Sequence, residues 1–222
     1  MNRSFVGRVY PEQRYRVEAE VIHAYARAIN EDNPSFIDSF PGGDLVAPPL
    51  FPAVYHPRAL SAVVGDPELG IDFTRTLHGE QDMHFHSVIR PNDTISTRAR
   101  IQAIEETDRG EALSLALEST NQDGQPVETT LLTLLMDRPA IPAALPDDPS
   151  DELRDPMMAV TQQIDADQTW RYAEASGDRS RIHLDPAVAR RAGLPGVTAH
   201  ALCTMAIVSK ALIDHLGGGE PS

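Results

Sequence analysis

An internal repeat, offset by 147 residues (Tyr25 to Tyr172), most constrains how this chain can fold. The segment Asn30–Phe36 then lies over Gly177–His183. Each copy opens with a short amphipathic helix, whose apolar residues recur at three-to-four spacing. Each then runs into a more apolar helix, near residues 50–64 in the first copy and about 197–216 in the second. A repeat of this length predicts two related domains side by side.

A proline-rich and acidic segment divides the two copies. Residues 139–160 hold five prolines together with several Asp and Glu residues, a composition that favours an extended surface linker over a packed element. We therefore predict an N-terminal domain over 1–138, a linker over 139–160 and a C-terminal domain over 161–222.

The first copy continues from its long helix into four segments rich in Ile, Leu, Val and Thr with partial alternation, which predicts strands. Good hairpin residues separate them, such as Pro91-Asn92-Asp93 and Asp123-Gly124. A helix followed by a four-stranded antiparallel meander that wraps it is a hotdog, an α+β fold. The predicted strands are Asp82–Arg90, Thr94–Glu106, Glu111–Asn121 and Val127–Arg138.

The second copy shows no comparable strands after its helix, so we expect a double hotdog whose second unit is incomplete at its C-terminal end. The 197–216 helix carries many apolar residues, and a helix of that kind must be covered by something. We expect that the sequence is a truncated form of a longer chain. The alternative is that another chain supplies the sheet.

Composition narrows the class of partner. The net charge of -14 over 222 residues argues against nucleic acid, since phosphate neutralisation needs clustered Lys and Arg. Apolar runs fall short of the roughly 20 residues that span a bilayer, and the first eight residues lack the apolar core of a signal peptide. The single cysteine excludes an intrachain disulfide and fits a reducing cytoplasm.

Two linked segments of the second copy carry its chemistry. Gly177–Pro186 contains Asp178 and, five residues later, His183, while Gly196–Thr204 opens the long apolar helix. Together they resemble the signature of the MaoC-like, or R-specific enoyl-CoA hydratase, family. The stretch His78–Gln81 in the first copy resembles the N-terminal domain of double-hotdog MaoC dehydratases.

This resemblance implies that Asp178 and His183 are catalytic and hold one water, which adds to or leaves from an acyl thioester. A carboxylate beside an imidazole can pass protons both ways. The backbone N–H of Ala201, at the helix start, would meet the enolate oxygen. In the first copy, Glu31 stands where Asp178 does and Phe36 where His183 does, so that copy is expected to be non-catalytic.

Further residues are expected to contact substrate. Phe36 would close or line the acyl pocket, Arg179 and Arg181 could meet the phosphates of coenzyme A or remain solvated, and His200 is expected mainly to bond loop backbone. No metal or cofactor is expected, because His84 and His86 have no evident third ligand. Asp165, with Gln168 three residues on, predicts a capping box at the first helix of the second copy.

The sequence therefore predicts an R-specific enoyl-thioester hydratase or 3-hydroxyacyl-thioester dehydratase, acting on coenzyme A or carrier-protein thioesters as a homodimer or hetero-oligomer. Ser180 and Arg181 replace the family's Asn-Pro, and Ala201 replaces a Gly. These departures support the alternative of a non-catalytic acyl-thioester-binding subunit that needs a partner. A thioesterase is a weaker third interpretation, because hotdog thioesterases lack this loop.

Overall fold

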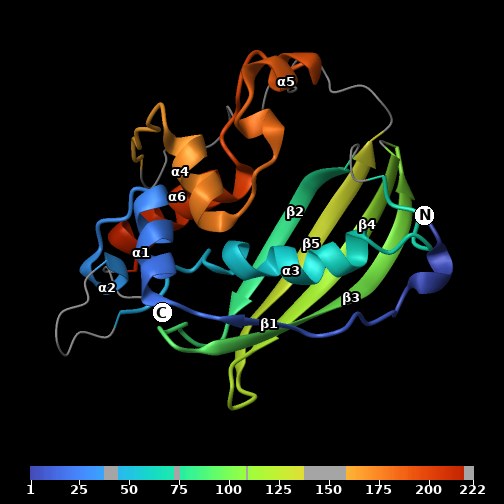
Figure 1. Ribbon diagram of the computed structural model, residues 1–222, viewed down its shortest axis with the longest axis horizontal. Coiled ribbons are helices and arrows are strands. Elements are labelled where there is room, and N and C mark those ends of the chain that lie inside the picture. The colour runs from blue at the N-terminus through green and yellow to red at the C-terminus, as the bar shows by residue number, and fades with distance from the viewer. Residues whose placement is uncertain (38–44, 73–75, 109, 138–158, 218–222) are drawn as a thin grey trace.

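In the computed structural model, which describes residues 1–37, 45–72, 76–108, 110–137 and 159–217, an antiparallel sheet curls around one long helix (Figure 1). The strands lie in the order β1-β3-β4-β5-β2. They are β1 (Gln13–Arg16), β2 (Thr76–Phe85), β3 (Thr94–Thr107), β4 (Gly110–Thr120) and β5 (Pro126–Asp137). The helices are η1 (Arg3–Phe5), α1 (Ala19–Ala28), α2 (Pro34–Ile37), α3 (Pro52–Val64), α4 (Gln168–Ser176), η4 (Arg181–His183), α5 (Pro186–Arg191) and α6 (Ala201–His215).

The sheet and α3 share one apolar core. On β4 the alternate residues Leu113, Leu115 and Leu117 are buried, and they pack in one cluster with Ala59 and Val63 of α3. Alternation of this kind points one face of a strand at a helix. The meander, its order and the helix across it confirm the predicted α+β hotdog fold.

Two details of the sheet differ from the sequence prediction. The strand predicted over 82–90 has the wrong bounds, because β2 begins at Thr76 and ends at Phe85. Its first half is polar and contains Gly79, so it has no strand pattern of its own. Pairing with β5 makes it a strand. The short strand β1, which pairs with β3, was not predicted, and the predicted linker lies mostly outside the described residues.

Between residues 159 and 217 the structure contains helices and no strand. The opening helices of the two copies pack against each other, and the equivalent rings of Tyr25 and Tyr172 lie 5.8 Å apart. Gln168 and Arg171 of α4 donate to the carbonyls of Ala28 and Arg27 at the end of α1. The equivalent helices of the two copies, α1 and α4, therefore contact each other directly.

The capping box predicted at Asp165 forms only in part. The Gln168 side chain accepts from the Asp165 N–H at 3.4 Å, but Asp167 occupies the N-cap and Asp165 turns to the Arg171 guanidinium at 2.7 Å. An ion pair with a charged donor outweighs a single backbone N–H for that carboxylate.

The helix predicted from residue 197 begins four residues later, at Ala201. One face of α6 packs Cys203, Ala206 and Ile207 into a core shared with α1 and α4. On the other face Val208 and Leu212 are 54% and 47% exposed. Over the described ranges, none of the helices has both the length and the hydropathy that crossing a bilayer requires.

Candidate active site

The loop that carries Asp178 is shaped by its own hydrogen bonds. Gly177 ends α4 in the left-handed region, at φ 80°, which glycine adopts without strain. The Asp178 N–H then donates to Ser176 Oγ at 3.2 Å, and Asp178 Oδ1 accepts from the Ser180 N–H at 3.0 Å. This turn holds the carboxylate in place although Ser180 and Arg181 replace the family's Asn-Pro.

His183 closes the short helix η4, where its N–H donates to the Ser180 carbonyl at 3.1 Å. Its ring Nδ1 lies 2.9 Å from the carbonyl oxygen of Thr198. A carbonyl only accepts, so Nδ1 carries the proton and Nε2 keeps the lone pair. Thr198, which sequence reasoning did not single out, thus sets the tautomer of His183.

His200 lies at the N-cap of α6 and is almost fully buried, at 1% exposure. Its Nε2 donates to the backbone carbonyl of Asp178 at 3.0 Å, and its ring lies 4.0 Å from that of His183. Burial, and then the neighbouring His183, lower the pKa of His200. A neutral His200 that bonds the loop backbone matches the role expected for it.

Together these bonds bring three groups to one point. One ligand-type atom each of Asp178, His183 and His200 lies within 4.8 Å of the others, a separation that one water can bridge. Such donors also suit a metal ion. However, imidazole lone pairs lie in the ring plane, and the two rings are stacked with only 32° between them. The arrangement therefore favours proton transfer over metal ligation.

Ala201 is the first residue of α6 and is exposed. A backbone N–H in the first turn has no acceptor within its own helix, and the helix dipole adds partial positive charge there. The residue directly follows His200, whose side chain groups with Asp178 and His183. A role for this N–H in stabilising an enolate oxygen stays a prediction.

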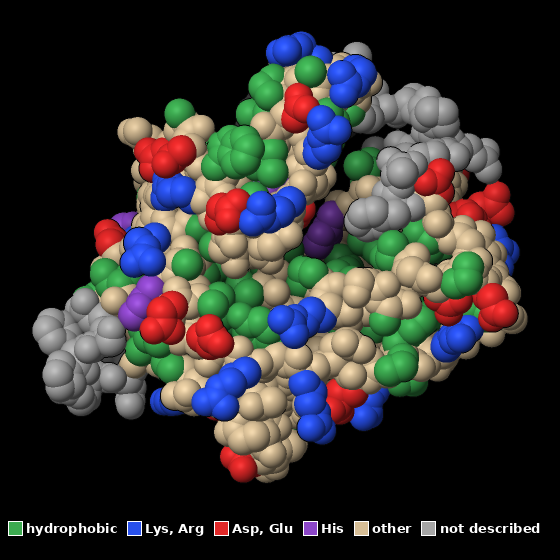
Figure 2. Space-filling model, in the orientation of Figure 1, with side chains coloured by type: hydrophobic (Ala, Val, Ile, Leu, Met, Phe, Trp, Pro, Cys, Tyr) green, Lys and Arg blue, Asp and Glu red, His purple; other side chains and the backbone are tan. Residues whose placement is uncertain are grey.

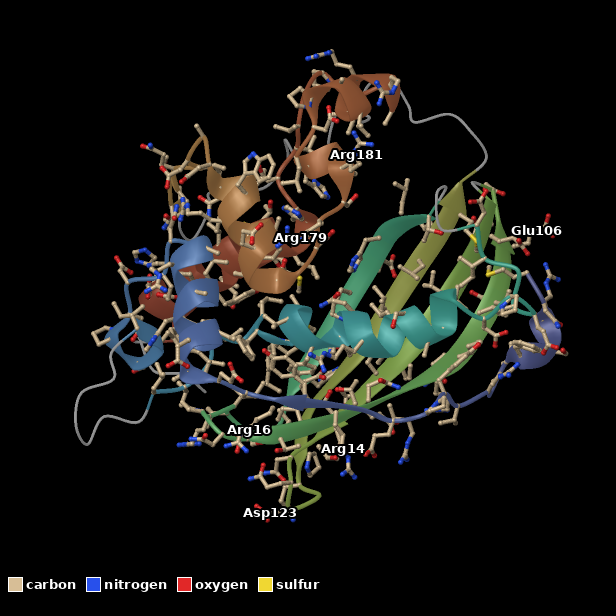
Figure 3. The ribbon with its side chains drawn as sticks, viewed as in Figure 1. Arg14, Arg16, Glu106, Asp123, Arg179 and Arg181 are labelled. Carbon is tan, nitrogen blue, oxygen red and sulfur yellow. The ribbon has the colours of Figure 1, made fainter. Side chains whose placement is uncertain are left out.

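Two predicted substrate residues, Arg179 and Arg181, lie on the segment between α4 and α5 (Figure 3). Both are exposed. Arg179 forms an ion pair with Glu174 at 2.8 Å, and Arg181 one with Asp185 at 2.6 Å. A contact of either arginine with the phosphates of coenzyme A would have to compete with these ion pairs. That contact stays a prediction.

The equivalent loop of the first copy holds a different set of groups. Glu31 is buried, and its Oε1 accepts from the N–H groups of Asp32 and Asn33 at 3.0 and 2.9 Å. Phe36, on α2, is 1% exposed. In this structure Phe36 fills space where the second copy has an imidazole, and contact with an acyl chain stays a prediction.

Sequence reasoning missed the partner of this loop, Lys210 of α6. Its Nζ lies 2.6 Å from Asp32 Oδ1, 2.5 Å from Asp214 Oδ2 and 4.0 Å from Glu31 Oε1. Burial opposes the charge, but hydrogen bonds to Asp214 and Asp32 raise the Lys210 pKa to about 12. A lysine inside an otherwise apolar helix was the available signal, because buried charges need partners.

Known proteins resemble this chain in sequence and in fold. A UPF0336 protein of Saccharopolyspora erythraea is 33% identical over 61% of this chain and 90% of its own length. The 3-hydroxyacyl-thioester dehydratase Y of Mycobacterium tuberculosis is 30% identical over 64% of this chain, which spans 52% of that protein. A crystal structure of a MaoC-like dehydratase from Phytophthora capsici superposes with a TM-score of 0.78 at 21% identity, over 99% of this chain and 79% of that one.

Family models match both parts of the chain. Residues 4–130 match the FAS1-like dehydratase domain region, and residues 150–222 match the MaoC-like domain. The first match alone covers more than half of the 222 residues. With its hotdog fold and its relatives, this chain belongs to the family of MaoC-like hotdog dehydratases and hydratases.

Proposed function

We propose that this chain is an R-specific enoyl-thioester hydratase or 3-hydroxyacyl-thioester dehydratase, acting on acyl-CoA or acyl-carrier-protein substrates. The observation that carries the proposal is the convergence of Asp178, His183 and the start of α6. The mycobacterial relative, a 3-hydroxyacyl-thioester dehydratase, supports the same reaction.

Each step of hydration can be assigned to one of these groups. In the proposed mechanism one water is held between the Asp178 carboxylate and the free Nε2 of His183, and Nε2 takes a proton from it as its oxygen bonds to C3 of the enoyl thioester. The electron pair of the double bond moves to the thioester oxygen, where the Ala201 N–H stabilises the negative charge. A proton returned by the Asp178–His183 pair to C2 completes the addition of one water, and dehydration is the reverse.

The test is an assay of crotonyl-CoA hydration by the purified chain. The reaction is monitored as the decrease in enoyl-thioester absorbance. Asp178→Asn and His183→Ala should each reduce turnover by roughly 10²–10⁴, the usual scale for acid–base groups. Asp123→Asn, at the exposed β4–β5 turn, and His84→Ala, on β2, are the matched controls and should keep wild-type turnover. Near-wild-type hydration by both site variants would remove the pair from the mechanism.

A second candidate is a non-catalytic acyl-thioester-binding subunit that needs a partner. It is favoured by the residues 159–217, where the structure has only helices, and by the exposed apolar face of α6. Crotonyl-CoA that binds without turnover, and that is hydrated once an active partner is added, would support this candidate. Turnover by the chain alone, lost in Asp178→Asn, would exclude it.

A further inference from the structure

Strand β2 of the N-terminal sheet contains a bulge at Gly79. His78 pairs with Leu134 and Glu80 already with Thr133, so the register shifts between them. A Cβ on Gly79 would lie 2.8 Å from Leu135 Cγ and 3.1 Å from the Thr133 carbonyl oxygen. This bulge therefore needs glycine, and bulges commonly redirect the side chains beside them.

The bulge places His78 and Gln81 on the same face of β2. In a regular strand, residues three apart point to opposite faces, but the extra residue cancels that alternation. His78 lies opposite Leu134 and Gln81 opposite Leu132, and both leucines belong to the core that α3 covers. His78 and Gln81 thus face the inside of the curled sheet.

The same face of β2 reaches the apolar core to which the C-terminal helices also contribute. Met83, opposite Thr130, packs against the core that contains Cys203 of α6 and Tyr172 of α4. Further up the strand, β2 borders a hollow between the C-terminal helices and the sheet, and Figure 2 shows histidine atoms inside it. His78 keeps access to solvent on this face.

Gln81 shares the inner face of β2 with His78 and is held by a hydrogen bond of its own. Its Nε2 donates to Met83 Sδ at 3.0 Å, which leaves its carbonyl oxygen available to other donors. Although the side chain reaches solvent, partial desolvation by its neighbours lowers the pKa of His78, and Gln81 and the Asp178 charge oppose this shift. The imidazole is neutral at pH 7, so one ring nitrogen holds a lone pair, and Asp178 is the group of the candidate site whose charge acts on this ring.

We propose that His78 is a substrate-contacting residue from the N-terminal sheet, which accepts a hydrogen bond from an N–H or O–H group of the bound acyl thioester while Asp178 and His183 act from the C-terminal loop. This rests on the proposed function of that loop. Acyl-CoA offers such donors in the amide N–H groups of its pantetheine arm, and the hydrated product adds its 3-hydroxyl.

The first test needs no turnover. Binding of butyryl-CoA and of (R)-3-hydroxybutyryl-CoA is measured by calorimetry for His78→Phe, with His84→Phe as the control, since His84 lies on the other face of β2 opposite Thr129. We expect His78→Phe to raise Kd about 3- to 10-fold, the scale of one neutral hydrogen bond, and His84→Phe to leave it unchanged. His78→Gln, which keeps an acceptor, should restore binding to within about twofold.

The comparison of the two ligands identifies the group that donates to His78. If His78→Phe loses affinity for both ligands, the donor is the pantetheine amide. If it loses affinity for the hydroxyacyl ligand alone, the donor is the 3-hydroxyl. If His78→Phe binds both ligands like wild type, the proposal is wrong, whereas the proposed function fails separately if Asp178→Asn keeps full hydration activity.

A second readout checks the placement itself. In an NMR titration, Asp178→Asn should lower the pKa of His78, because it removes a carboxylate that favours the charged imidazole. An unmoved His78 titration would show that the two side chains are too far apart to share a ligand, and would overturn the proposal.

Discussion

Replacing Lys210 by Met should destabilise the chain, because it leaves the buried Glu31 carboxylate without its cation. Breaking a fully buried ion pair costs about 3–5 kcal/mol, and an exposed pair about 0–1 kcal/mol. Lys210 and Glu31 are buried, but the other two partners, Asp32 and Asp214, reach solvent with 80% and 28% of their side chains exposed. We therefore expect a loss of about 2–3 kcal/mol, between the two limits.

The assay is urea unfolding of the purified chain at pH 7, with thermal unfolding beside it. A loss of that size corresponds to a fall in Tm of about 4–12 °C for a chain of this length. Lys210→Arg should stay close to wild type because it keeps the charge. Asp214→Asn should cost about 0–1 kcal/mol, since that carboxylate is partly exposed.

Two results decide whether the buried carboxylate is the cause. Glu31→Gln added to Lys210→Met should recover more than half of the lost stability, because an amide oxygen still accepts from Asn33 without a charge to bury. Burial raises the Glu31 pKa. The cost of burying its charged form therefore lowers the free energy of unfolding only as pH rises above the pKa of this carboxyl in the unfolded chain. The loss of stability in Lys210→Met should therefore be smaller at low pH. Strictly additive effects of the two substitutions, with no pH dependence, would refute the reasoning.

Three further predictions concern the N-terminal domain. Burial works to raise the pKa of Glu128, but hydrogen bonds from His56 and others outweigh it and lower that pKa, so its contribution to stability is present above the unfolded pKa and lost as pH falls. Glu128→Gln should cost about 1.5–3 kcal/mol at pH 7 in urea unfolding and flatten the acid limb of the stability curve; equal pH profiles would contradict this. Glu31→Gln should leave crotonyl-CoA turnover within about threefold, below ~1 kcal/mol in barrier, and a variant as inactive as Asp178→Asn would place the working site in the other copy. Phe36→Ala should change KM or chain-length preference more than kcat across a series of acyl-CoA substrates, and a selective loss of kcat would argue for a role in the chemical step.

The sequence by itself determined those features that depend on neighbours in the chain. The left-handed Gly177, the Asp185 cap of α5 with Pro186 at its first position, and Gly193 at φ 85° all follow from local backbone preferences. The long strands of the meander could also be predicted, because alternation over ten or more residues is a strong signal. The family resemblance of Gly177–Pro186 identified the loop that carries Asp178 and His183, and the offset between the copies located its equivalent at Asn30–Phe36.

The tertiary structure alone decided what depends on residues far apart in the chain. The first half of β2 is a strand only because β5 lies beside it, and the bulge at Gly79 then places His78 on the inner face of the sheet. Lys210 finds its partners across about 180 residues of sequence, at Glu31 and Asp32. Thr198 fixes the tautomer of His183 only once η4 and the start of α6 have come together. Long-range contacts of this kind leave no periodicity in a sequence, because their energy is gained only when distant elements pack.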